Sequence, residues 1–243
     1  MNINACTYPR IIAHRCGGAL APENSLTGLD MAARLGCRGV EFDVMLSKDG
    51  VPLLIHDETL ERTTTGSGRV CELNAAQIRA FDAGSKHHQA FAVLPAPTFD
   101  EALARCTELT LWANIEIKPA TGHDEATGLA VAKRLLNDWD GNGIVSSFSL
   151  VALQAARRIA PQLPMALLYK QLPANWANTA NELNASAIHL AADHVDAVVA
   201  AALGQRPWAC YTVNQRAIAE QLFALGCHAV FTDRPDLWAV SEM

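Results

Sequence analysis

The sequence lacks long runs of charge of one sign and long runs of apolar residues. Its 243 residues carry 19 Lys and Arg against 25 Asp and Glu, a formal net charge of −6. Without a basic patch, we expect no binding to nucleic acid or to an anionic membrane, because both require clustered positive charge. No apolar stretch is long enough for a membrane span, and the N-terminus does not resemble a signal peptide. These absences favour a cytoplasmic protein that acts on a small molecule, and the sequence is compatible with a homo-oligomer.

Paired cysteines and a dinucleotide-binding loop are also missing. The seven cysteines are odd in number and scattered, and none forms a Cys-x-x-Cys pair, so neither a disulfide framework nor a zinc site is predicted. No Gly-x-Gly-x-x-Gly follows the first predicted strand, which disfavours a doubly wound nucleotide-binding sheet. Half of the residues are hydrophobic, which suits one large α/β domain or two small ones.

Short apolar strands alternate with amphipathic helices along the chain. Asn24 or Ser25 is expected to cap a helix that stops at Gly36, and Asp193 a helix that stops near Gly204. Further helices are predicted over 99–106, 123–139 and 149–159, and strands over 10–15, 39–45, 112–118, 144–148, 165–169, 187–190, 208–213 and 229–232. Eight such units predict a (β/α)8 TIM barrel, with a doubly wound sheet as the alternative.

The alternation is interrupted after the second predicted strand. Ser47-Lys48-Asp49-Gly50 is a strong tight-turn signal, and the apolar segment 51–56 that follows must run antiparallel. Simple pairing across a turn centred on Asp49-Gly50 places Asp43 opposite His56. The stretch up to Pro97 contains no strong strand signal. We therefore expect one barrel domain over residues 1–243, with a hairpin and small insertion at about 47–97 that covers one end of the barrel.

The second predicted strand carries two carboxylates on one face. Glu41 and Asp43 alternate with Val40, Phe42 and Val44, and side chains on a strand point to opposite faces in turn. In a barrel, the apolar set would pack under the helices while the carboxylates point to the axis. Two carboxylates in a low-dielectric interior repel each other unless a cation or a proton holds them.

The third predicted strand adds another carboxylate to this interior. In segment 112–118, Asn114, Glu116 and Lys118 share the inward face. Three converging carboxylates form an all-oxygen donor set, which suits Mg²⁺ or Ca²⁺, or Mn²⁺, rather than Zn²⁺. Such a cation would polarise a phosphoryl oxygen as a Lewis acid. The alternative is a wet rim, where the carboxylates pair only with Lys118 or Arg15.

Two histidines stand where the predicted strands bring them to the same carboxylates. His14 and Arg15 lie at the carboxyl end of the first strand, where barrel active sites gather, and His56 ends the hairpin. Imidazoles titrate near neutral pH, so two of them could act as general acid and general base on a phosphodiester, in either order. Arg15 and Lys118 would supply fixed positive charge to its phosphate.

The same residues lie in motifs that resemble the glycerophosphodiester phosphodiesterases. HRCGGALAPENS, VEFDVMLSKDGVPLLIHDETLERTTTGSG, ANIEIKP, SSFS, YTVN and FTDRP occur in the order and spacing of that family, over about 9–235. The resemblance is greatest to its bacterial cytosolic members of glycerol-3-phosphate uptake. It implies a TIM barrel that hydrolyses glycerophosphodiesters to sn-glycerol 3-phosphate and an alcohol. It also implies site residues, namely a divalent cation on Glu41, Asp43 and Glu116, the acid/base pair His14 and His56, phosphate contacts from Arg15 and Lys118, and substrate-pocket walls from Phe148 and Tyr211.

One departure from the family pattern keeps other functions open. Cys16 stands where the family usually has glycine after His-Arg, so a positive φ there would strain the backbone. A catalytically impaired barrel that only binds a phosphate ligand is therefore one alternative. A metal-dependent enolising enzyme with Lys118 as its base is another, although His14 and His56 favour phosphodiester chemistry.

Overall fold

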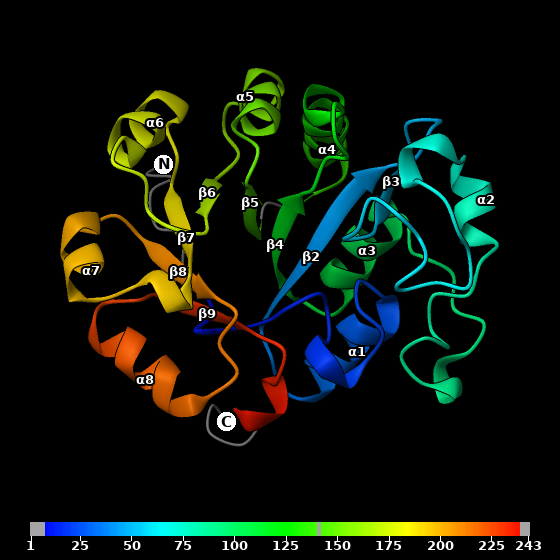
Figure 1. Ribbon diagram of the computed structural model, residues 1–243, viewed down its shortest axis with the longest axis horizontal. Helices are drawn as coiled ribbons and strands as arrows, with labels where there is room; N and C mark the ends of the chain where they lie inside the picture. Colours follow the sequence, from blue (N-terminus) through cyan, green and yellow to red (C-terminus); the bar gives the residue numbers. More distant parts are fainter. Residues whose placement is uncertain (1–7, 140–141, 239–243) are drawn as a thin grey trace.

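Eight parallel strands close into a barrel in the computed structural model, which describes residues 8–139 and 142–238 (Figure 1). Closure comes from β1, which pairs with β9 on one side and with β2 on the other. The strands are β1 Ile11–Ala13, β2 Gly39–Leu46, β3 Pro52–Leu54, β4 Trp112–Ile117, β5 Gly143–Ser147, β6 Met165–Tyr169, β7 Ala187–Ala191, β8 Trp208–Tyr211 and β9 Ala229–Thr232. Only β3 is antiparallel among these strands, and it extends the sheet beyond β2.

Helices surround this ring of strands (Figure 1). They are α1 Leu26–Arg34, α2 Ala75–Arg79, α3 Phe99–Glu108, α4 Asp124–Asp138, α5 Leu150–Ile159, α6 Trp176–Leu183, α7 Ala197–Leu203 and α8 Arg216–Ala224. Short 3-10 helices cover Gly18–Leu20, Val70–Glu72, Gln89–Phe91, Ala192–His194 and Pro235–Leu237. The predicted (β/α)8 barrel is confirmed. The doubly wound alternative is wrong because an open sheet has two edge strands, whereas here the pairing of the first strand with both β2 and β9 closes the parallel strands into a ring.

Alternation along the strands separates two apolar regions. Val40, Phe42 and Val44 of β2 point outward into the main core under the helices, where the ring of Phe42 meets that of Phe99 edge to face at 6.3 Å. A second, smaller cluster fills the barrel interior at the amino-terminal ends of the strands and includes Trp112. The inward positions nearer the carboxyl ends are therefore free to carry polar groups.

One predicted helix cap is confirmed and one is wrong. The Ser25 hydroxyl accepts a hydrogen bond from the Gly28 N–H at 3.0 Å and caps α1. Asp193 does not cap α7, because it lies in a 3-10 turn. Asp196 takes that place, and its carboxylate accepts hydrogen bonds from the N–H groups of Val198 and Val199, both at 2.9 Å.

The predicted hairpin register is shifted by one residue. In the structure, Val44 pairs with Leu54 and Leu46 with Pro52, so Asp43 does not lie opposite His56. The turn holds three residues instead of two, because the Ser47 hydroxyl binds the backbone of Val51 and Gly50 adopts φ +74°. The ladder ends at Leu54, whose N–H donates to Pro97, and His56 reaches the barrel from the loop beyond it.

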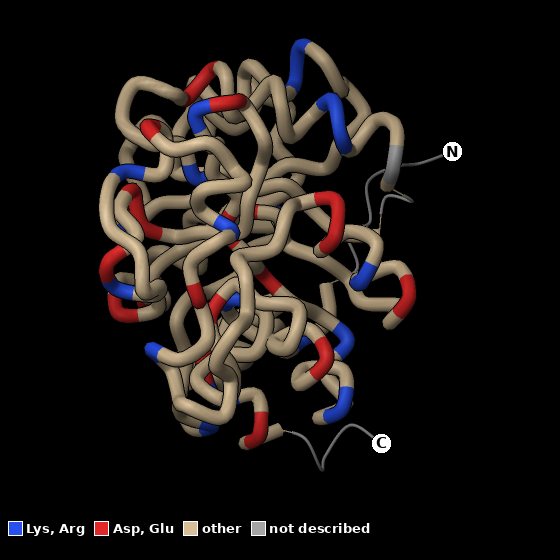
Figure 2. Tube along the Cα trace, turned by 90° about the vertical axis from the view of Figure 1, so that its right-hand side faces the viewer, with Lys and Arg blue, Asp and Glu red and all other residues tan. Residues whose placement is uncertain are grey.

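The segment after β2 lies against one side of the barrel, where it contains α2 and two 3-10 helices but little regular strand (Figure 1). It has a small apolar core of its own, which includes Leu60, Val70 and Ile78 and joins the barrel through Met45. Figure 2 shows acidic and basic residues interspersed over the turned molecule instead of segregated by sign. Among the described residues, no helix is long and apolar enough to cross a membrane.

Candidate active site

Three buried carboxylates converge inside the barrel. Glu41, Asp43 and Glu116 each place an oxygen within 4.8 Å of the others. The register of β2 and β4 explains the cluster, since Asp43 pairs directly with Glu116 and Glu41 with Asn114, all facing inward. This is the acidic cluster that the alternation of the two strands predicted.

Burial and mutual repulsion make the cluster electrostatically unfavourable by itself. Burial, with the charge of Asp43, raises the pKa of Glu41 to about 7 and that of Glu116 to about 8. Burial also opposes ionisation of Asp43, but Lys118, His56 and Arg15 outweigh it and hold the pKa of Asp43 below its ordinary value. The group therefore favours a bound cation or proton.

Buried oxygens without a protein partner support a cation over protons alone. Glu41 Oε1 and Asn114 Oδ1 accept no hydrogen bond from the described residues, although both are fully enclosed. Asn114 is oriented by its amide nitrogen, which donates to Ser146 Oγ at 2.9 Å. Oxygen atoms left unpaired in a buried site are costly, and hard divalent cations bind such oxygens. These residues fit a divalent ion of the Mg²⁺ or Ca²⁺ type.

His14 lies at one edge of the cluster and is held by an aspartate from the far end of the chain. Its Nδ1 is 2.7 Å from Asp233 Oδ1, and its Nε2 is 3.8 Å from Glu41 Oε2. Barrel closure makes this contact, because β1 and β9 are neighbours. Burial opposes protonation of His14, but the hydrogen bond to Asp233 and the charge of Glu41 outweigh it, so the pKa of His14 lies above its ordinary value.

His56 occupies a contrasting environment. Its Nδ1 lies 2.6 Å from Asp57 Oδ1, while its Nε2 lies 2.9 Å from Lys118 Nζ. Because an ammonium can only donate, this contact requires Nε2 of His56 to be unprotonated. Burial, together with Lys118 and Arg15, holds the pKa of His56 below its ordinary value despite the nearby Asp43. Asp57 is itself bound by Arg62 Nε at 2.5 Å.

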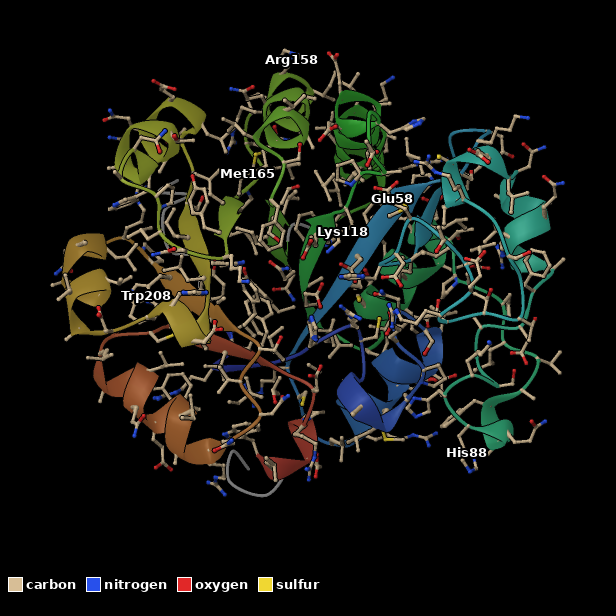
Figure 3. The ribbon with its side chains drawn as sticks, in the orientation of Figure 1. Glu58, His88, Lys118, Arg158, Met165 and Trp208 are labelled. Atoms are coloured by element: carbon tan, nitrogen blue, oxygen red, sulfur yellow. The ribbon has the colours of Figure 1, made fainter. Side chains whose placement is uncertain are left out.

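Two cations adjoin the carboxylates. Lys118 Nζ is 3.1 Å from Glu116 Oε1 and 3.6 Å from Asp43 Oδ1, and Figure 3 shows the side chain near the middle of the ring of strands. The backbone N–H of Arg15 donates to Glu41 Oε2 at 2.7 Å. Arg15 Nε makes no hydrogen bond with the described residues but lies 3.8 Å from Asp43 Oδ2 as an ion pair. The guanidinium therefore adds positive charge beside the carboxylates.

The carboxylates, both histidines and both cations line one pocket of about 310 Å³. Phe148, just after β5, and Tyr211, at the end of β8, form its aromatic side, with ring centroids 5.9 Å apart. Tyr211 is fixed by its hydroxyl, which donates to the carbonyl of Tyr169 at 2.9 Å. All nine site residues named from the sequence therefore lie around one cavity.

Cys16 adopts a left-handed backbone conformation, which glycine would accommodate more easily. Its φ is +75°, and that of Arg15 is +49°, so both lie in the left-handed region. The thiol is fully buried in the main core, and burial raises its pKa well above the ordinary value. A buried thiol with a raised pKa is a poor nucleophile, so a nucleophilic role for Cys16 is disfavoured.

Sequence reasoning missed the groups that orient the site. The sequence predicts Asn24 only as a possible helix cap. In the structure its amide nitrogen donates to Asp43 Oδ2 at 2.9 Å, and its amide oxygen accepts from the Asp43 N–H at 3.1 Å. Asp57 and Asp233 hold the two histidines. Asp57 carried a signal, because it follows His56 directly, whereas Asp233 becomes a candidate only once the barrel brings β9 beside β1.

Known proteins resemble this chain over nearly its whole length. Residues 14–237 match the model of the glycerophosphoryl diester phosphodiesterase family. A glycerophosphodiester phosphodiesterase of Caldanaerobacter subterraneus is 31% identical over 236 residues, which span 93% of this chain and 94% of that protein.

Solved structures resemble the whole barrel. A phosphodiesterase of Oleispira antarctica, solved with the product sn-glycerol-3-phosphate, superposes with a TM-score of 0.92 at 31% identity and covers 96% of this chain and 97% of that one. A glycerophosphodiester phosphodiesterase of Agrobacterium tumefaciens gives a TM-score of 0.78 at 27% identity, over 96% of this chain and 99% of that one.

Proposed function

The chain belongs to the glycerophosphoryl diester phosphodiesterase family, and we propose that it hydrolyses glycerophosphodiesters to sn-glycerol 3-phosphate and an alcohol. One observation carries this proposal. His14 and His56, each backed by an aspartate, line the same pocket as a buried three-carboxylate cluster and two cations. The aromatic side of the pocket, formed by Phe148 and Tyr211, would hold the glycerol moiety.

The phosphate of the substrate would be held by positive charge. Arg15 offers its guanidinium, which lies beside Asp43, and Lys118 offers the ammonium that contacts Glu116. Glu41, Asp43 and Glu116 would hold a divalent ion, with Mg²⁺, Ca²⁺ and Mn²⁺ as candidates. When bound, that ion supplies Lewis acidity at the phosphoryl group.

The two histidines would move the protons of the reaction. His56 presents an unprotonated Nε2 to the pocket, which suits the base that removes the proton of the glycerol 2-hydroxyl. The hydroxyl oxygen would then bond to phosphorus as the bond to the alcohol oxygen breaks. His14 lies beside the carboxylate of Glu41, which favours its protonated form, and would give its proton to the departing oxygen.

Hydrolysis would be completed by water. The first step leaves a five-membered cyclic phosphate on glycerol, with His56 protonated and His14 neutral. His14 would next take a proton from water as the water oxygen bonds to phosphorus. The bond between phosphorus and the glycerol 2-oxygen would break, and His56 would return its proton to that oxygen. Both histidines would end in their starting states, and the product would be sn-glycerol 3-phosphate.

The test is release of glycerol 3-phosphate from glycerophosphoethanolamine, coupled to a dehydrogenase, with chelated protein and each divalent ion added back separately. We expect turnover that depends on the ion. The variant Glu116→Gln keeps the shape of the cluster but removes one charge, and should need a higher ion concentration for half-maximal rate. Folded protein that binds glycerol 3-phosphate but turns over no glycerophosphodiester with any ion would contradict the proposal and favour the binding barrel.

A further inference from the structure

A second cleft, of about 480 Å³, opens beside the catalytic pocket. The two cavities share Arg15, and Asp233, which holds His14, lines the second cleft. The aromatic residues Phe148 and Tyr211 line the catalytic pocket but not the second cleft. The second cleft therefore begins where the phosphate and the acid of the proposed reaction would lie, away from the glycerol side.

The carboxylates of this cleft are already satisfied. Both oxygens of Glu23 accept hydrogen bonds from Arg62, at 2.7 and 2.8 Å, and one also accepts from Arg15 at 3.1 Å. The two oxygens of Asp233 bind His14 and Asn214. A cationic group in the cleft would find neither carboxylate unpaired. The cleft also has no Phe, Tyr or Trp in its lining, so it has no cage for a quaternary ammonium.

Lys86 differs from the other charged groups that line the cleft, because it has no ionic partner among the described residues. Arg62 is engaged by Glu23 and Asp57, and Arg234 by Asp236 at 2.7 and 2.9 Å. Lys86 is exposed at the rim and has no hydrogen bond or ion pair with any of the described residues. Its ammonium is an uncompensated positive charge facing the cleft.

The loop that presents Lys86 is held in place. Asp82 Oδ1 accepts hydrogen bonds from the N–H groups of Gly84 at 2.8 Å, Ser85 at 3.3 Å and Leu94 at 3.2 Å. A side chain at Gly84 could not fit, since a Cβ would lie 1.8 Å from the Phe91 carbonyl oxygen. The position of Lys86 is thus built into the fold of the segment after β2.

We propose that this cleft receives the departing alcohol, and that Lys86 favours alcohols that carry an acidic group. In displacement at phosphorus, the attacking and leaving oxygens lie roughly in line on opposite sides. With glycerol against Phe148 and Tyr211, the alcohol leaves on the side of Arg15 and Asp233, into the cleft. This inference rests on the proposed function and names the class of its leaving group.

Glycerophosphoserine and glycerophosphoethanolamine form a matched pair of probes, because they differ by one carboxylate on the alcohol. We expect kcat/KM to favour the serine diester by about three- to fivefold, the size of one exposed ion pair. The preference should shrink at about 0.5 M salt, since an exposed charge pair is screened. Lys86→Gln should bring the ratio near one, and Lys86→Glu should favour the ethanolamine diester.

Lys170→Gln is the matched control, because Lys170 is also exposed but borders the cavity beside Phe148 and Tyr211. It should keep the wild-type ratio. Equal ratios in wild type, Lys86→Gln and Lys86→Glu, with normal turnover of both diesters, would overturn the role of Lys86 and leave the proposed function intact. Absence of turnover of every glycerophosphodiester in the wild type would overturn both.

Discussion

The two ends of the barrel interior use the same strands but opposite kinds of side chain. At the amino-terminal end, the inward residues are apolar, and they include Ile12 of β1 and Trp112 of β4. Two residues further along, the inward positions carry His14, just after β1, and Asn114 on β4. Four residues beyond Trp112, the inward position of β4 carries Glu116. One end is closely packed and dry, while the other gathers charge in a buried site.

The difference shows how the barrel tolerates three buried carboxylates. A packed amino-terminal end fixes the strand register, and that register brings Asp43 beside Glu116. Packing at the amino-terminal end therefore holds the three carboxylates in place at the carboxyl end. A bound cation would relieve the repulsion between them. Changes at the carboxyl end should mainly affect turnover, whereas changes nearer the packed end should mainly affect stability.

The largest effect on turnover should come from the histidines. Replacing His14 or His56 with Ala should lower kcat by about 10³-fold, because each carries a proton in the proposed reaction. Both rings line the pocket instead of packing in the apolar core, so the melting temperature should change little. Steady-state kinetics and a melting curve on each variant test this. A variant that keeps near full rate would exclude its histidine as an essential catalyst.

A substrate with a p-nitrophenol leaving group separates the two roles. This group departs without a proton. In a single turnover, which reports the first step alone, the rate of alcohol release lost in His14→Ala should therefore be recovered at least about tenfold for nitrophenolate relative to an alkyl diester. His56→Ala should show no such recovery, because the attacking hydroxyl still needs a base. Equal recovery in both variants would show that the acid and base assignments are wrong.

Much of this end of the barrel was predictable because it follows from alternation. Glu41, Asp43 and Glu116 face inward for the same reason that Val40 and Phe42 face outward, and no long-range information is needed. The hairpin register was not predictable in this way. It depends on whether the Ser47 side chain binds Val51 and lengthens the turn by one residue, which the turn signal Asp-Gly does not reveal.

Contacts between distant segments were harder still. Asp193 and Asp196 are equally good capping residues by sequence, and only the 3-10 turn at Ala192–His194 decides between them. Asp233 lies 219 residues from His14 in the chain, so its role appears only when closure of the barrel joins β9 to β1. The direction in which a strand residue points follows from its own strand, whereas its hydrogen-bond partners depend on the closed fold.

Asp233→Asn should have the next largest effect on turnover. Asp233 contacts His14 without touching the reacting atoms, so we treat it as a positioning residue, and its loss should lower kcat/KM by about 10²-fold. Without the carboxylate, the pKa of His14 should fall, and the alkaline limb of the pH profile should move to lower pH. That shift separates positioning from a general loss of structure.

Asp236→Asn is the matched control for this change. Asp236 lies on the same terminal segment but pairs with Arg234 instead of a histidine. Its substitution should leave the pH profile in place. If Asp233→Asn lowered the rate without moving the profile, the proposed control of His14 through this hydrogen bond would be wrong.

The smallest effect on turnover, and the clearest on stability, should involve His189, which joins the two ends of the interior. Its ring is fully buried, its Nε2 meets the Tyr8 hydroxyl at 2.8 Å, and burial lowers its pKa to about 3. In the unfolded chain this histidine binds a proton below about pH 6.5. The unfolded state therefore binds more protons between pH 6.5 and 3, and stability falls as the pH falls through that range.

Between pH 6.5 and 5 this linkage should cost about 2 kcal/mol of unfolding free energy. Urea unfolding at a series of pH values measures it. His189→Gln cannot take up the proton, so whatever its stability at pH 7.5, its unfolding free energy should fall less steeply with acid than that of the wild type. His123→Gln is the control and should keep the wild-type slope, because His123 is exposed and its ring makes no hydrogen bond with the described residues. Identical slopes in His189→Gln and wild type would mean that the interior admits a charged His189, and the packed end of the barrel would then be less dry than its apolar lining indicates.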